Sequence, residues 1–174
     1  MRTTLLIVAV FLLIAVAALS FTAGYSAETA SDSGLSWKSF DEGSTLAVQQ
    51  KKKLLIDVYT DWCVWCKKMD AEVYPDAKVR SVLASKFVVV KLDAESDRTL
   101  RYNGTAMTQR EFARAVGVTG YPATVFFDET LKPITLLPGY VKAEDFSQIL
   151  NYIGENHYKN KSYQDYLKSL ASLK

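Results

Sequence analysis

Histidine and cysteine are scarce in this sequence, and their scarcity excludes several kinds of site. The 174 residues include one histidine, His157, and two cysteines, Cys63 and Cys66. A structural zinc site needs four such ligands, so we predict no metal ion and no bound cofactor. Covalent haem attachment requires a histidine directly after the second cysteine, where this chain has Lys67. We interpret His157 as a surface residue.

The chain also lacks a strong excess of either charge. It has 21 Lys and Arg against 19 Asp and Glu, a net charge of +2, and the basic residues are scattered. Nucleic-acid binding would favour basic residues gathered on one face, so we predict no nucleic-acid partner. Hydrophobic residues make up 49% of the chain, enough for the core of one domain of ordinary size.

The N-terminal segment differs from the rest of the chain. Arg2 is followed by an apolar run without any charge at residues 5–23. This pattern is typical of a secretory signal peptide, and its length also suits a retained membrane anchor. We expect residues 1–26 to be one or the other, and residues 27–36 to form a flexible tether. Either way, the folded part is expected to be periplasmic or otherwise exported, with residues 5–23 as a possible anchor in the inner membrane.

The remaining sequence alternates between apolar runs and amphipathic segments. We expect strands at 54–60, 87–93, 125–127 and 133–137, and helices at 41–53, 67–73, 76–86, 109–116, 143–156 and within 162–173. Strands joined through helices pair in parallel, whereas the final hairpin is antiparallel. The predicted fold class is therefore α/β, a mixed central sheet flanked by helices, with a domain at 37–154 and a C-terminal helical extension at 155–174.

Both cysteines lie where a strand gives way to a helix. Unpaired N–H groups at the start of a helix stabilise an anion, and Cys-X-X-Cys pairs there have lowered thiol pKa values. Cys63 is expected at an exposed helix start as the nucleophile, and Cys66, one turn deeper, as the resolving thiol. A purely structural disulfide is the competing interpretation. It is less favoured because so short a loop constrains little chain entropy.

The segment 55–67, which includes Asp57, Trp62 and both cysteines, resembles the active-site segment of thioredoxins. It is most similar to the carboxyl-terminal domain of the DsbD electron transporters and to SoxW-like periplasmic thioredoxins. The resemblance continues through Lys91, through Tyr121-Pro122 and to Tyr140. It implies a thioredoxin fold. The pair Val64-Trp65 between the cysteines departs from the Gly-Pro of ordinary thioredoxin, so the redox potential does not carry over.

The resemblance also implies a role for each matching residue. Cys63 and Cys66 would form the redox disulfide, with Asp57 as the buried acid that handles the proton of Cys66 and Lys91 as the lysine near it. Pro122 matches a cis-proline that exposes the backbone of the preceding residue to a substrate strand. The substrate-binding residues are then expected to be Trp62, Trp65, Tyr121 and Pro122.

From these residues we expect an exported thiol-disulfide oxidoreductase that reduces protein disulfides in cytochrome c maturation, sulfur metabolism or disulfide repair. Its electron donor would be a membrane thiol transporter of the DsbD type, because an oxidising compartment does not keep thiols reduced. We expect a monomer. Two alternatives stay open: a disulfide oxidase or isomerase, and a thioredoxin-fold binding module whose disulfide is structural.

Overall fold

A computed structural model describes residues 34–172 of the chain. The predicted signal or anchor at residues 5–23 therefore lies outside the described residues. Within the described part, no helix is both long and apolar enough to cross a bilayer. The expected boundaries of tether, domain and extension remain predictions.

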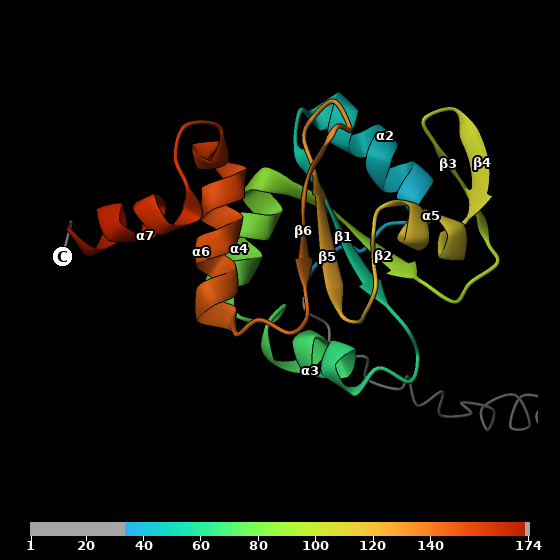
Figure 1. The fold of residues 1–174 in the computed structure, drawn as a ribbon, viewed down its shortest axis with the longest axis horizontal. Helices are drawn as coiled ribbons and strands as arrows, with labels where there is room; N and C mark the ends of the chain where they lie inside the picture. The colour runs from blue at the N-terminus through green and yellow to red at the C-terminus, as the bar shows by residue number, and fades with distance from the viewer. Residues whose placement is uncertain (1–33, 173–174) are drawn as a thin grey trace, which may run out of the picture. The chain divides into compact units, whose positions relative to one another are not determined.

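The centre of the fold is a four-stranded sheet in the order β2-β1-β5-β6 (Figure 1). Its strands are β1 (Lys53–Tyr59), β2 (Phe87–Asp93), β5 (Ala123–Phe127) and β6 (Pro133–Pro138). β1 pairs in parallel with β2 and antiparallel with β5, and β5 pairs antiparallel with β6. The predicted mixed sheet is thus confirmed.

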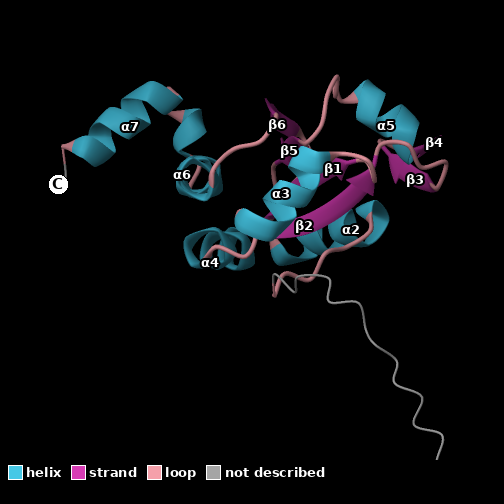
Figure 2. Ribbon diagram, turned by 90° about the horizontal axis from the view of Figure 1, so that it is seen from below, coloured by secondary structure: helices cyan, strands magenta, loops and turns pink. Residues whose placement is uncertain are grey.

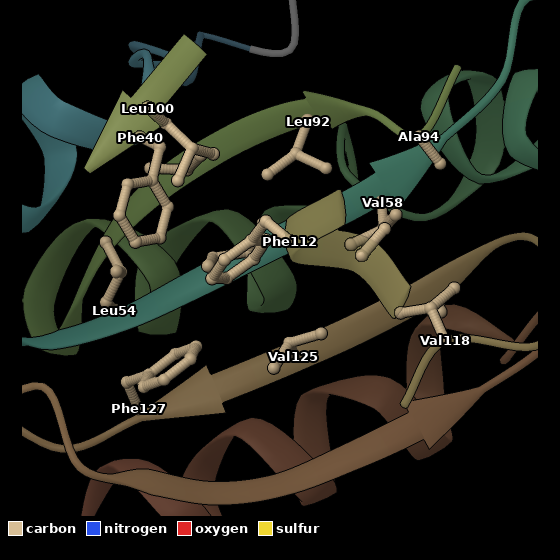
Figure 3. Close-up of a cluster of buried hydrophobic side chains, with 14 of the residues drawn as sticks. Phe40, Leu54, Val58, Leu92, Ala94, Leu100, Phe112, Val118, Val125 and Phe127 are labelled. Atoms are coloured by element: carbon tan, nitrogen blue, oxygen red, sulfur yellow. The ribbon is translucent and has the colours of Figure 1, made fainter. Parts of the chain in front are cut away.

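The central strand β1 is buried on both faces, as its nearly continuous apolar sequence predicts. Successive side chains point to opposite faces. Leu54, Ile56 and Val58 join one core cluster, which Figure 3 shows. Leu55 joins the other cluster, on the face toward which Asp57 also points.

Helices cover both faces of the sheet (Figures 1 and 2). On one face lie α2 (Phe40–Gln50) and α5 (Gln109–Ala115), whose Phe40 and Phe112 enter the first cluster. On the other face lie α3 (Val64–Glu72), α4 (Ala77–Lys86) and α6 (Ala143–Gly154). Most of these helices begin at a side-chain cap: the carboxylate of Asp76 accepts from the backbone N–H of Val79 at 3.1 Å at the start of α4.

Two elements differ from the sequence prediction. The helix expected at 41–53 ends at Gln50, because Lys51 adopts a left-handed conformation with φ 52° and the chain then enters β1. The polar stretch before residue 109, for which we expected neither a strand nor a helix, forms a hairpin of β3 (Thr99–Tyr102) and β4 (Thr105–Thr108). Asn103 and Gly104 both have positive φ, as a tight hairpin turn requires.

The C-terminal helix expected beyond the main domain is present. A 3₁₀ turn, η1 (His157–Lys159), leads from α6 to α7 (Tyr163–Ala171). Tyr166 is the buried residue of α7, and its ring lies 5.3 Å from that of Tyr152 on α6. The last helix is therefore held against α6 through aromatic contacts.

Candidate active site

The two cysteines form a disulfide at the N-terminus of α3. Their sulfur atoms are 2.07 Å apart and their Cα atoms 5.3 Å apart. Cys63 is the N-cap residue, and its Sγ accepts a hydrogen bond from the backbone N–H of Cys66 at 3.0 Å. When the pair is reduced, the same N–H and the helix start favour a thiolate on Cys63 over a thiol.

The exposure of this stretch differs from our expectation for Cys63. Both cysteines are only 3% exposed, whereas Trp62 is 63%, Val64 is 72% and Trp65 is 54% exposed. The bonded sulfur of Cys63 turns back over the first turn of α3 to accept the N–H of Cys66, so it is the neighbouring side chains that face solvent. The disulfide is consequently surrounded by exposed apolar side chains.

An ion cluster that is buried at Asp57 joins the sheet to the helix that carries the cysteines. The parallel register of β1 and β2 sets Lys91 beside Asp57, and Lys91 Nζ lies 2.5 Å from Asp57 Oδ2. The same Nζ lies 2.6 Å from Oδ1 of Asp70, one turn after Cys66 on α3. Asp57 is 1% exposed. One ammonium group is thus shared by two carboxylates, one from the sheet and one from α3.

Aromatic rings surround the ammonium group of Lys91. Its Nζ lies 5.0 Å from the ring centre of Trp37, 5.2 Å from that of Tyr59 and 5.4 Å from that of Tyr74. Such ring faces attract a cation, most strongly where water is excluded. The cage therefore supports the charged form of Lys91 in a largely buried position.

The surroundings raise the pKa values of both Asp57 and Lys91, but for different reasons. Burial raises the pKa of Asp57 above its ordinary 3.8, although Lys91 pulls it down. Burial by itself lowers the pKa of Lys91, but Asp57 and Asp70 outweigh burial and the net shift is upward. Asp57 is thus a carboxyl group that takes up a proton more readily than an exposed one.

One carboxylate oxygen of Asp57 is available to accept a proton. Oδ1, the oxygen that Lys91 does not use, is buried without a well-formed hydrogen bond, and so is the hydroxyl of Tyr74. Tyr74 is near enough as a donor to lower the pKa of Asp57, an effect smaller than that of Lys91. Burial raises the pKa of Tyr74 well above its usual value, so this hydroxyl keeps its proton.

The loop before β5 forms a second side of the site. The peptide bond between Tyr121 and Pro122 is cis, and the carbonyl of Pro122 accepts from the N–H of Gly139 at 2.8 Å. The ring of Tyr121 lies 5.9 Å from that of Trp62 at an interplanar angle of 78°. The indole N–H of Trp62 donates to Glu95 at 3.1 Å. Trp62 therefore stands largely in solvent but is held by two contacts.

The structure brings the predicted residues together in pairs: Cys63 with Cys66, Asp57 with Lys91, and Trp62 with Tyr121. Trp65 instead pairs with Tyr140, at 5.3 Å between ring centres. The roles assigned to these residues remain predictions. Sequence reasoning missed Asp70, whose position four residues after Cys66 on one helix face was a usable signal. It also missed Trp37 and Tyr74, which no spacing rule links to Lys91.

No cluster of three or more His, Cys, Asp or Glu side chains suited to a metal ion occurs among residues 34–172. The site itself presents several reactive side chains. They offer a dithiol or disulfide pair, a buried carboxyl group and a shared ammonium group.

Comparison with known proteins gives this arrangement a context. Residues 40–154 match the family of thioredoxin-like domains. The chain is 33% identical over 110 residues to the thiol:disulfide interchange protein DsbD of Actinobacillus pleuropneumoniae, a match covering 62% of this chain and 17% of that protein. The chain thus spans about one sixth of the length of the curated relatives that it matches.

Solved structures share the fold. A thioredoxin-fold protein from Helicobacter pylori has a TM-score of 0.58 at 23% identity, covering 71% of this chain and 82% of that one. The reduced C-terminal domain of DsbD from Neisseria meningitidis has a TM-score of 0.51 at 20% identity, covering 63% and 90%. The predicted fold, and the distant similarity to the C-terminal domain of DsbD, are confirmed.

Proposed function

The chain belongs to the family of thioredoxin-like domains, and from this premise we propose that it reduces disulfide bonds of other proteins through Cys63 and Cys66. The observation that carries the proposal is the placement of the cysteine pair. It caps α3 beside exposed Trp62, Val64 and Trp65, and the same helix is tied through Asp70 and Lys91 to the buried Asp57. A merely structural disulfide needs neither the apolar surroundings nor the buried acid.

The first step of the exchange uses the thiolate of Cys63. It attacks one sulfur of the substrate disulfide, a bond forms between the two proteins, and the other substrate sulfur leaves as a thiolate. The backbone N–H of Cys66, which donates to Sγ of Cys63 in the disulfide form, stabilises the attacking anion. The exposed indoles on either side supply an apolar surface for the approaching protein.

The second step uses Cys66 and Asp57. The thiol of Cys66 loses its proton and attacks Sγ of Cys63, which releases the substrate as a dithiol and leaves the Cys63–Cys66 disulfide. Asp57 is suited to take the proton because burial raises its pKa and its Oδ1 is open. Lys91 remains paired with Asp70 while Asp57 changes its charge. Two electrons thus pass from the cysteine pair to the substrate.

The setting of this reaction is also part of the proposal. The apolar run at residues 5–23 supports export, either with a cleaved signal or with a retained anchor. In an oxidising compartment the pair must be re-reduced from elsewhere. We assign that task to a membrane thiol transporter of the DsbD type. This chain would act as a monomer.

The test separates the two cysteines. Purified protein, reduced beforehand, is mixed with insulin, and reduction is followed by the precipitation of the insulin B chain. Wild type is expected to reduce insulin, and Cys63→Ser to reduce none. Cys66→Ser is expected to accumulate a covalent complex with the substrate, visible on a non-reducing gel, because the complex lacks its resolving thiol. Reduction by Cys63→Ser at the wild-type rate contradicts the proposal.

The direction of electron flow is tested by the redox potential of the pair. Potentials run from about −270 mV for the reductant thioredoxin to about −120 mV for the oxidant DsbA. We expect a value near the first, measured by equilibration with glutathione buffers. A value near the second would reassign the protein as an oxidase.

A further inference from the structure

A cleft of about 590 Å³ opens beside the disulfide. It is lined by Trp65, Lys68, Glu72, Tyr140, Lys142 and Ala143. The first three lie on one face of α3, because residues three and four positions apart are neighbours on a helix. The others come from the connection between β6 and α6, and from the first residue of α6. Since Trp65 stands between the two cysteines, the cleft begins at the reactive pair.

Two aromatic rings form the walls of this cleft. The ring of Trp65 lies 5.3 Å from that of Tyr140 at an interplanar angle of 45°. Lys68 Nζ lies 5.9 Å above the ring of Tyr140. Trp65 is 54% exposed, so its ring has a free face. The walls offer a surface on which the methylene groups of a long side chain can pack.

The charges around the cleft are not balanced. Both oxygens of Glu72 have a partner within the chain: Oε1 accepts from Lys68 at 2.7 Å and Oε2 accepts from the hydroxyl of Tyr140 at 3.1 Å. Lys142 is exposed, and its ammonium group takes part in none of the ion pairs between described residues. Glu144 and Asp145 follow it on α6 but do not line the cleft. Among the residues that line the cleft, the surplus charge is therefore positive.

We propose that this cleft receives an acidic side chain of the substrate protein, from the segment that flanks its reactive cysteine. The methylene groups of a glutamate would pack on the rings of Trp65 and Tyr140, and its carboxylate would meet Lys142. A basic side chain at the same place would be repelled by Lys142 and would find both oxygens of Glu72 already in use. The inference rests on the proposed disulfide reduction and names the property by which substrates are chosen.

The test uses disulfide-linked peptides that differ at one residue. Each carries Glu, Gln or Lys at one of the three positions on either side of its cysteine. The full chain, purified in mild detergent and reduced beforehand, is given each peptide, and kcat/KM is measured from the released thiol. At low salt, and at the position that reaches the cleft, we expect Glu to be preferred over Lys by about fivefold, as for an exposed charge pair. Because the pair is solvent-exposed, high salt is expected to remove most of the preference.

Variants of Lys142 test whether this residue causes the preference for Glu over Lys peptides. Lys142→Gln is expected to remove most of it and Lys142→Glu to reverse it, whereas Lys161→Gln, an equal charge change far along the chain, is expected to leave it unchanged. If wild type reduces Glu and Lys peptides at equal rates, the inference is overturned while the proposed function stands. If no peptide is reduced, the proposed function fails and the inference falls with it.

Discussion

At the scale of single residues, the decisive feature is the sharing of Lys91 by two carboxylates. Asp57 is fully buried, and a lone carboxylate there would be costly. Because Lys91 also binds Asp70, it stays charged and fixed whether or not Asp57 carries a proton. Asp57 can therefore change its protonation state without the loss of the neighbouring ion pair, which is what a proton acceptor in a reaction cycle requires.

The raised pKa of Asp57 has a consequence for stability. The folded protein binds this proton more tightly than the unfolded chain, so the contribution is favourable at low pH and is lost as pH rises through the raised pKa, above 3.8. Asp57→Asn cannot ionise and escapes this loss. At neutral pH we expect the disulfide form of Asp57→Asn to be more stable than wild type, because Lys91 keeps Asp70 as a partner. The difference should shrink toward pH 4.

Urea unfolding of the oxidised proteins between pH 4 and pH 8 measures this difference. Asp97→Asn, at an acid whose side chain is 77% exposed, is the matched control and should show no such trend. The same Asp57→Asn protein should resolve its mixed disulfide about 100-fold more slowly, since it lacks the proton acceptor. A variant that is less stable than wild type at every pH would contradict the assignment of burial as the main cause.

At the scale of elements, the close approach of α2 to the sheet depends on Gly43. A Cβ at this position would lie 2.3 Å from Cγ2 of Val90, a core residue of β2 with no exposed surface. A contact that short forces one element to move. The absence of a side chain at Gly43 thus sets the distance between the helix and the strand that carries Lys91.

Gly43→Ala is accordingly expected to destabilise the protein by up to about 2 kcal/mol. Overpacking costs about 1–3 kcal/mol, and the better helix propensity of alanine returns about 1 kcal/mol. Thermal or urea unfolding measures the change. Gly120→Ala, whose Cβ would meet nothing within 4 Å, serves as the control and should be near neutral. Combining Gly43→Ala with Val90→Ala should show a coupling between the two sites. Additive effects would refute the proposed clash.

How far the sequence predicts these elements depends on the range of the interactions involved. The buried strands β1 and β2 and the capped helix after Asp76 follow from local patterns, and the structure has them. The hairpin of β3 and β4 was missed because each strand has only four residues, too few for a clear alternation. The end of α2 depends on a left-handed Lys51, a conformation that lysine rarely adopts and that its sequence does not announce.

The candidate site shows the same limit. The cysteine pair and Asp57 are recognisable along the chain. The sharing of Lys91 with Asp70 depends instead on how α3 packs on the sheet, and the cage ring of Trp37 comes from a segment before α2. The cleft at Trp65 needs a loop more than seventy residues away in sequence, since Tyr140 follows β6. Tertiary packing therefore decides what local patterns cannot.

At the scale of the whole molecule, the helix α7 is an addition to one end of the fold. It is held by Tyr166, which is 5% exposed and packs against Tyr152 and His157 at 5.3 Å and 4.8 Å between ring centres. Neither the cysteine pair nor the ion cluster of Asp57 and Lys91 has a contact with this helix among the interactions of the described residues. The extension is therefore expected to support the fold and not the reaction.

A chain that ends at Lys161 tests this separation. It keeps the hydrogen bond from the hydroxyl of Tyr152 to the carbonyl of Lys161, at 2.7 Å. We expect the free energy of unfolding to fall by about 1–3 kcal/mol, because the truncated chain no longer buries Tyr166. The rate of insulin reduction is expected to be unchanged. Tyr166→Ala in the full chain should reproduce most of the loss. A truncated protein that is folded but inactive would show that α7 takes part in catalysis.

The order of strands in the sheet has a consequence for how the protein is made. Asp57 lies in register with Lys91 on one side and Thr124 on the other, and β5 is synthesised long after the cysteines. Until β5 arrives, one edge of β1 stays in water, and the surroundings that bury Asp57 are incomplete. A nascent chain would then carry two thiols but no tuned proton acceptor. The proton acceptor of the second exchange step would therefore be complete only after β5 has paired with β1.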